Sequence, residues 1–143
     1  MKRTPCPQKQ VLVIRKDLEM DAGKLGGQTA HACHLALLGD VRPKEGEAPL
    51  EELTFTLRGA AARWLQADFT KMTLEVYSEE ELQAIYRQAQ DAGLPCGLAV
   101  DNGWTVFKNQ KTATVVAIGP AETEAVNRIT GHLKKYQSKP EAV

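Results

Sequence analysis

Near the start of the chain, three side chains that could bind a negatively charged group stand at helical spacing. Lys24, Gln28 and His31 stand at positions i, i+4 and i+7 of the segment GKLGGQTAH. At about 100° per residue these positions share one stripe of a helix, so a cation, an amide and an imidazole face the same way. Lys24 stands near the helix N-terminus, where free N–H groups favour anions, and the stripe therefore predicts an anion or oxyanion site. The same spacing also fits a solvated polar face, which spacing alone favours.

A second group of candidate residues lies in the segment DNGWT, residues 101–105, which follows an apolar, strand-like run. Functional side chains of open α/β sheets gather at strand ends. Asp101 could orient or deprotonate a water molecule there, and the Thr105 hydroxyl could hold a substrate. Trp104 could stack on a base or a ribose, or it could close the loop onto the core. Taken alone, the segment is more typical of an Asx turn in which Asp101 caps its own backbone.

His31, Cys33 and His34 are close enough in sequence to suggest a metal site. On a helix, however, Cys33 points to the packed side, and no second Cys or His pair elsewhere in the sequence completes four ligands. A cysteine on an apolar stripe is usually an inert part of the core. We therefore predict neither a metal site nor a cysteine nucleophile.

Basic side chains stand near the ends of several expected elements. They are Arg15, Lys16, Lys24, Lys108, Lys111, Lys134 and Lys135. Brought together by folding, they could hold a phosphate backbone without reading a base sequence. They also fit an ordinary protein surface, because 18 acidic residues balance the 18 Lys and Arg residues of the chain.

The elements that must position these residues alternate between strand and helix patterns. Strands are expected at 11–14, 71–77, 94–100 and 113–118, and helices at about 23–39, within 59–69, at 79–93 and at 121–136. Ser78 begins a capping box, and the short helix is expected to turn Ala61, Trp64 and Leu65 inward. This alternation predicts a three-layer α/β domain, in which a mixed four-stranded sheet carries helices on both faces.

Length and composition are those of one globular domain. The chain has 143 residues, a net charge of zero and three cysteines, an odd number that favours a reducing, cytoplasmic setting. No signal peptide and no apolar run of about 18 residues, the length that spans a membrane, is present. We predict one domain over 1–143 with loose ends at 1–9 and 137–143. The proline-, glycine- and charge-rich start of 40–59 indicates an insertion there.

The motifs occur together in the order seen in a known family. The chain resembles the archaeal and eukaryotic type of peptidyl-tRNA hydrolase, the second family of that activity. The matching segments are KQVLVIRKDLEMDAGKLGGQTAHA at 9–32, RWLQADFTKMTLEVYSEEEL at 63–82, DNGWT at 101–105 and TATVVAIGPAETEAVNRITGHLKKY at 112–136.

The resemblance implies a fold, an activity and a set of site residues. The fold is a mixed four-stranded sheet with flanking helices, usually in a homodimer. The activity is hydrolysis of the ester that joins a peptide to the 3′ ribose oxygen of tRNA, which recycles peptidyl-tRNA lost from ribosomes during translation. The resemblance implies Lys24, Asp101 and Thr105 as catalytic residues and no metal or organic cofactor. We further expect the following residues to bind substrate: Gln28, His31, Trp104, Arg15, Lys111 and Thr112.

The sequence departs from the family pattern in a few places. Gly26-Gly27 replaces small alanines after the Gly-Lys pair, Val100, Asn102 and Trp104 are unusual beside Asp101, and the connection at 40–59 is longer. The altered turn leaves two alternatives open. One is a non-catalytic relative that binds tRNA or a protein, and the other is a hydrolase of a different acyl ester or amide.

Overall fold

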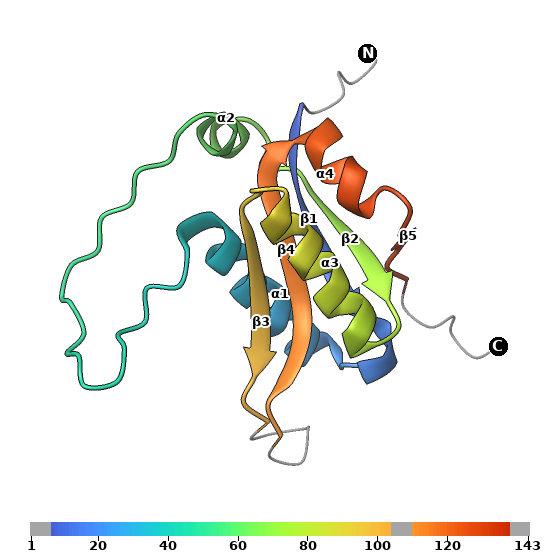
Figure 1. Ribbon diagram of the computed structural model, residues 1–143, viewed down its shortest axis with the longest axis horizontal. Coiled ribbons are helices and arrows are strands. Elements are labelled where there is room, and N and C mark those ends of the chain that lie inside the picture. Colours follow the sequence, from blue (N-terminus) through green and yellow to red (C-terminus); the bar gives the residue numbers. More distant parts are fainter. Residues whose placement is uncertain (1–6, 104–109, 138–143) are drawn as a thin grey trace.

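A single mixed sheet organises the described part of the chain. The computed structural model describes residues 7–103 and 110–137, and within them five strands lie in the order β3-β4-β1-β2-β5 (Figure 1). The strands are β1 (Gln8–Arg15), β2 (Lys71–Val76), β3 (Cys96–Asp101), β4 (Thr112–Glu122) and β5 (Lys134–Lys135). The helices are α1 (Ala22–Leu38), α2 (Ala60–Gln66), α3 (Glu79–Asp91) and α4 (Thr123–Thr130), with a short 3-10 turn at Lys16–Leu18.

β1 lies at the centre of the sheet, as its unbroken apolar run predicts. It pairs in parallel with β2 and antiparallel with β4, while β3 pairs antiparallel with β4 and β5 antiparallel with β2. The predicted mixed α/β sheet is therefore confirmed. The sequence left the pairing of the third and fourth strands open, and in the structure this pair is antiparallel.

Alternate residues of β1 pack against different helices. Val11 and Val13 lie in a cluster with residues of α3 and α4, including Leu82, whereas Leu12 and Ile14 lie in a second cluster with Ala32 and Ala36 of α1. Figure 1 shows α3 in front of the sheet and α1 behind it. Because strand side chains alternate in direction, the apolar run of β1 contributes to two cores.

The prediction of four strands is wrong, because β5 adds a fifth. The expected helix at 121–136 ends at Thr130, and Lys134 and Lys135 pair with Glu75 and Leu74 at the edge of β2. Leu133 nevertheless still packs on the core through a turn in which its N–H donates to the Thr130 carbonyl at 3.0 Å. A turn thus brings Leu133 to the core, where the predicted longer helix would have placed it.

Two strands also extend beyond their predicted bounds. β1 begins at Gln8. The last two residues of the loose end expected at 1–9, Gln8 and Lys9, are therefore buried strand residues. β4 continues through Gly119 and Pro120 to Glu122, which lies opposite Gln8. The strand predicted at 113–118 thus continues through a glycine and a proline.

The structure tests two further predictions about helices, the cap of α3 and the inward side chains of α2. The Ser78 side chain accepts a hydrogen bond from the Glu81 N–H at 3.1 Å, which confirms the predicted cap of α3. In α2, Trp64 is buried, but Leu65, expected to point inward, is exposed.

Between α1 and α2, residues 40–59, here called the arm, form neither helix nor strand and extend away from the sheet (Figure 1).

Candidate functional site

The site begins at the N-terminus of α1, which fixes the position of Lys24. Asp21 is the N-cap residue, and its carboxylate accepts a hydrogen bond from the Lys24 N–H at 2.9 Å. Such a cap satisfies one of the N–H groups that the first turn leaves without a helical partner. Lys24 is therefore held in the first turn of α1, where the end of β3 lies beside it.

Lys24 and Asp101 form an ion pair at this point. Lys24 Nζ lies 2.6 Å from Asp101 Oδ2, and the Lys24 and Asp101 side chains are only 17% and 5% exposed. Gln28 Nε2 donates to the same oxygen at 3.2 Å, and the Gly103 N–H donates to Oδ1 at 2.6 Å. Both carboxylate oxygens are therefore engaged, by groups from α1 and from the turn that follows β3.

These contacts decide the charge of Asp101. The hydrogen bond from Lys24 lowers the pKa of the Asp101 carboxyl below its ordinary value, although burial acts in the opposite direction. The Gly103 N–H and the positive charge of Lys24 lower the pKa further, with a smaller effect from His31. Hydrogen bonds to the charged form and a nearby cation both favour ionisation. Asp101 is thus an ionised, firmly oriented carboxylate at neutral pH.

Gln28 connects the ion pair to the core of the sheet. Its Oε1 atom accepts a hydrogen bond from the Thr114 hydroxyl at 2.6 Å, which leaves its Nε2 group directed at Asp101. Thr114 lies on β4 and is fully buried, and its hydroxyl is also 3.1 Å from the Ala99 carbonyl oxygen. The sequence prediction missed Thr114. Its signal was a single hydroxyl within the apolar run ATVVAI.

A glycine on β3 allows α1 to approach the sheet closely. A Cβ atom added at Gly97 would lie 2.6 Å from Leu35 Cβ and 2.7 Å from the Ala36 nitrogen. Real Cβ atoms essentially never come that near, so any larger residue would push α1 away from β3. Gly97 therefore helps to bring Lys24 to Asp101, four residues further along β3, and the sequence prediction missed this role too.

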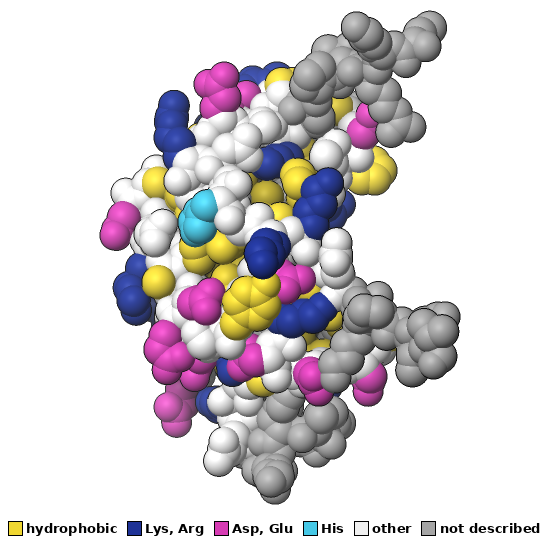
Figure 2. Space-filling model, turned by 90° about the vertical axis from the view of Figure 1, so that its right-hand side faces the viewer, with side chains coloured by type: hydrophobic (Ala, Val, Ile, Leu, Met, Phe, Trp, Pro, Cys, Tyr) yellow, Lys and Arg dark blue, Asp and Glu magenta, His cyan; other side chains and the backbone are white. Residues whose placement is uncertain are grey.

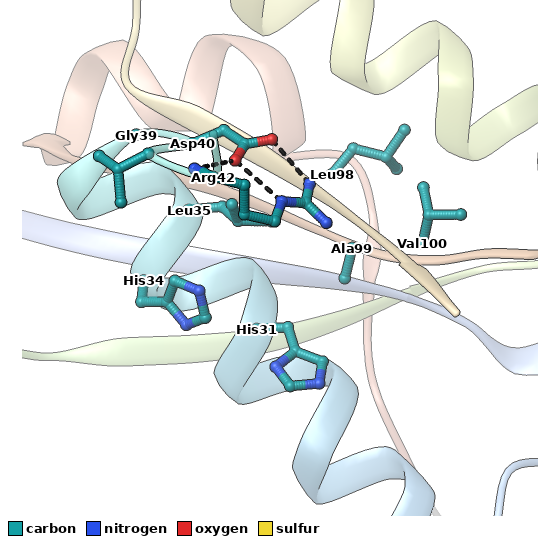
Figure 3. A pocket seen from close by; sticks show the side chains of 10 residues that line it. His31, His34, Leu35, Gly39, Asp40, Arg42, Leu98, Ala99 and Val100 are labelled. Atoms are coloured by element: carbon teal, nitrogen blue, oxygen red, sulfur yellow. Dashed lines mark hydrogen bonds and ion pairs between the residues drawn. The ribbon is translucent and has the colours of Figure 1, made fainter. Parts of the chain in front are cut away.

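A pocket of about 370 Å³ lies between α1 and the edge strand β3. His31 and His34 line it on one side and Leu98 and Val100 on the other, together with Arg42, which pairs with Asp40 (Figure 3). The two imidazole rings are 6.0 Å apart, and His31 is exposed rather than hydrogen-bonded to the Lys24–Asp101 pair. The predicted stripe thus divides, with Lys24 and Gln28 directed at Asp101 and His31 at the pocket.

The structure does not bring the other predicted binding residues into the ion-pair cluster. The Arg15 guanidinium binds Asp17 at 2.7 Å and the Ala113 carbonyl oxygen at 3.1 Å. Lys111 is exposed, and Thr112 lies opposite Asp101 in the β3–β4 pairing, with its hydroxyl 3.0 Å from the Gln110 carbonyl oxygen. Trp104 and Thr105 lie outside the described residues, as does Lys108.

On the β5 side of the molecule, the basic residues do not form one uniform patch. Lys16 lies over the Tyr136 ring, 4.6 Å from its centroid, with its Nζ atom 3.9 Å from the Glu75 carboxylate. Figure 2, which views the β5 side of the molecule, shows Lys and Arg side chains interspersed with Asp and Glu. The charge on this face is therefore mixed.

Residues 7–103 and 110–137 contain no group of three His, Cys, Asp or Glu side chains that could hold a metal ion. Burial raises the pKa of the Cys33 thiol, as expected for an unreactive cysteine. In the same residues, no helix has the length and apolar character needed to cross a membrane.

An ammonium that is only partly exposed and is held by an oriented carboxylate, close to a pocket, is suited to stabilise negative charge that develops on a bound substrate. Such preorganised donors are usually the largest single contribution to ester hydrolysis, because they need no rearrangement during the reaction.

Comparison with known proteins identifies the family to which the chain belongs. The family model "Peptidyl-tRNA hydrolase PTH2" matches residues 8–136. A peptidyl-tRNA hydrolase of Methanocaldococcus jannaschii is 40% identical over 88% of this chain and 97% of its own, and one of Halobacterium salinarum is 37% identical over 90% and 99%.

A solved structure of a protein of unknown function from Agrobacterium tumefaciens has a similar fold. Its TM-score is 0.53 and its sequence identity 12%, over 92% of this chain and 99% of that one. At this identity the likeness concerns the fold alone. From the family match over 8–136 and the archaeal relatives, we conclude that this chain belongs to the PTH2 family of peptidyl-tRNA hydrolases.

Proposed function

We propose that this chain hydrolyses the ester bond of peptidyl-tRNA at the Lys24–Asp101 pair. The observation that carries the site assignment is the 2.6 Å contact between Lys24 Nζ and Asp101 Oδ2. The family match supports the reaction, and the buried, fully engaged carboxylate supports the place.

In this proposal Lys24 is the residue that touches the reacting atoms. Water adds to the ester carbonyl carbon, and the carbonyl oxygen becomes negative while the bond between the carbonyl carbon and the ribose 3′ oxygen still holds. The Lys24 ammonium stabilises the carbonyl oxygen, because a positive donor aimed at the developing charge acts most strongly away from bulk water. The bond between the carbonyl carbon and the ribose oxygen then breaks, the ribose oxygen takes the proton that the added water gives up, and the peptide leaves as a carboxylic acid.

Asp101 and Gln28 act in this proposal as positioning residues. The lowered pKa of Asp101 makes its carboxylate a weak base at neutral pH, which supports a role in orienting Lys24. Gln28, itself held by Thr114, donates to the same carboxylate oxygen as Lys24. Thr105 and Trp104 stay predicted site residues that follow the turn at Gly103.

The pocket beside His31 is proposed to take the part of the substrate next to the ester. It opens beside α1, and its walls combine imidazoles with apolar side chains of β3, which suits a peptide side chain or a nucleobase. We also propose, from the family resemblance, that the protein is a cytoplasmic homodimer that recycles peptidyl-tRNA.

A comparison of two substrates tests the tRNA assignment. Turnover of peptidyl-tRNA and of a small N-acyl amino ester would be measured from low to high salt. We expect strong preference for peptidyl-tRNA, with kcat/KM falling as salt rises, because contacts to phosphates release counterions. Preference for the small ester, with no dependence on salt, would overturn the assignment.

A further inference from the structure

The arm contains a strand-like segment that contacts little of the chain to which it belongs. Residues 53–57 read Leu-Thr-Phe-Thr-Leu, an alternation typical of a strand with one apolar face. Yet Leu50, Leu53 and Phe55 are 76%, 49% and 41% exposed. Exposed apolar side chains gathered in one segment indicate a surface that another molecule covers. The arm therefore carries one half of an apolar contact.

The body of the same chain carries an uncovered apolar groove. We define the α1–α2 groove by Cys33 and Leu37 of α1, Trp64 and Leu65 of α2, and Phe69. The groove has a volume of about 520 Å³, and Leu65 and Phe69 at its wall are exposed. It is large enough to take several apolar side chains of an extended segment.

Charges at the groove match those of the arm. Lys71 lines the groove, with its Nζ atom 4.9 Å from the Trp64 ring centroid and 5.1 Å from that of Phe69. Glu51 and Glu52 directly precede the alternating segment of the arm. The arm thus offers apolar side chains and acidic groups to a groove with apolar walls and a cation.

We propose that residues 50–57 of one copy of this chain occupy the α1–α2 groove of a second copy. Each chain carries both uncovered halves, so a two-fold pairing in which the arms are exchanged covers all four surfaces at once. The direction of the arm, which leads away from its own sheet in Figure 1, supports a partner in trans. In the exchanged pair Leu53 and Phe55 enter the groove.

Disulfide trapping between two distinguishable chains tests the exchange, with a reporter cysteine at Leu65, an exposed residue of the groove wall. All chains carry Cys6→Ser, Cys33→Ala and Cys96→Ala. The groove chain carries Leu65→Cys, whereas the arm chain carries a single cysteine placed in turn at each position from 53 to 57, and a larger tag. Equimolar mixtures are oxidised and separated on a non-reducing gel.

We expect a mixed disulfide of the two chains at one or more arm positions, with alternate positions giving the stronger bands. The matched control replaces an exposed aromatic elsewhere, Tyr77→Cys, which lies beyond the opposite end of β2 from Lys71, and it should give none. A third chain with both Leu65→Cys and the arm cysteine tests docking in cis. If that chain closes an intramolecular disulfide while the mixture gives no mixed product, or if no arm position reacts with the cysteine at position 65 at all, the exchange is wrong.

Discussion

Lys24 Nζ and Asp101 Oδ2 lie 2.6 Å apart although 77 positions separate the two residues in the sequence. Three local features bring them together. Asp21 caps the helix that carries the lysine, Gly97 lets that helix approach β3, and Thr114 orients the glutamine that shares the carboxylate. Because Thr114 and Gly97 lie beside the ion pair rather than in it, each can be replaced without substituting Lys24 or Asp101.

Replacing Thr114 with valine should weaken the site through Gln28. The change removes the hydroxyl that binds Gln28 Oε1 at 2.6 Å, so the amide is no longer held toward Asp101. A lost buried hydrogen bond of this kind costs about 1–1.5 kcal/mol, and we expect kcat/KM for peptidyl-tRNA to fall roughly tenfold. Steady-state kinetics measure the change. Thr73→Val, on the exposed side of β2, is the control, and equal kinetics of the two variants would contradict the role given to Thr114.

The ion pair should make stability depend on acid. The pKa of Asp101 is lower in the folded chain than in the unfolded chain, so the unfolded state takes up a proton first as the pH falls. The stability that the charged form contributes is therefore complete above the unfolded pKa, about 4, and is lost as the pH falls through the folded value.

Urea unfolding of wild type and Asp101→Asn at a series of pH values measures this contribution. We expect the difference in free energy of unfolding to be largest near neutral pH and to shrink steadily below pH ~4. A difference that stays constant down to the acid limit of folding would show that Asp101 has no lowered pKa.

An added methyl group at Gly97 should separate α1 from β3. A Cβ at this position would meet Leu35 and the Ala36 backbone, neither of which can move without shifting the helix. We expect Gly97→Ala to cost about 1–3 kcal/mol of stability and to lower kcat, since Lys24 would move relative to Asp101.

Gly26→Ala on the same helix is the matched control, because a Cβ there meets nothing within 4 Å. It should stabilise the chain by up to ~1 kcal/mol through helix propensity and leave kcat unchanged. Thermal unfolding and turnover of both variants decide the matter. Equal effects of the two substitutions would rule out close packing at Gly97 as a determinant of the site.

Local sequence patterns were sufficient for most elements of the fold. The apolar run of β1, the alternation of β2 and the cap at Ser78 each contain the physical cause of the element that forms. β5 could not be predicted, because its two residues are a strand only by pairing with the edge of β2. The helical spacing of Leu133 predicted a longer helix, but the turn after Thr130 brings Leu133 to the core as well.

The site shows the same division between local and distant causes. Spacing placed Lys24 and Gln28 on one stripe, but only the tertiary structure shows that Asp101 and Thr114 turn Gln28 into a buried group while His31 stays at an open pocket. Gly97 could not be recognised from sequence, since its importance lies in the distance to a helix that precedes it by about sixty residues.

Turnover of peptidyl-tRNA by Lys24→Ala and Asp101→Asn tests the central claim most directly. Loss of a charged donor to a developing oxyanion typically costs a factor of about 10²–10³ in kcat, and we expect Lys24→Ala to lose at least ~100-fold. Because the two residues act as a pair, the double variant should lose little more than Lys24→Ala alone. Lys44→Ala, an exposed arm lysine, should behave as wild type. If folded Lys24→Ala releases peptide at the wild-type rate, the Lys24–Asp101 pair is not the hydrolytic site.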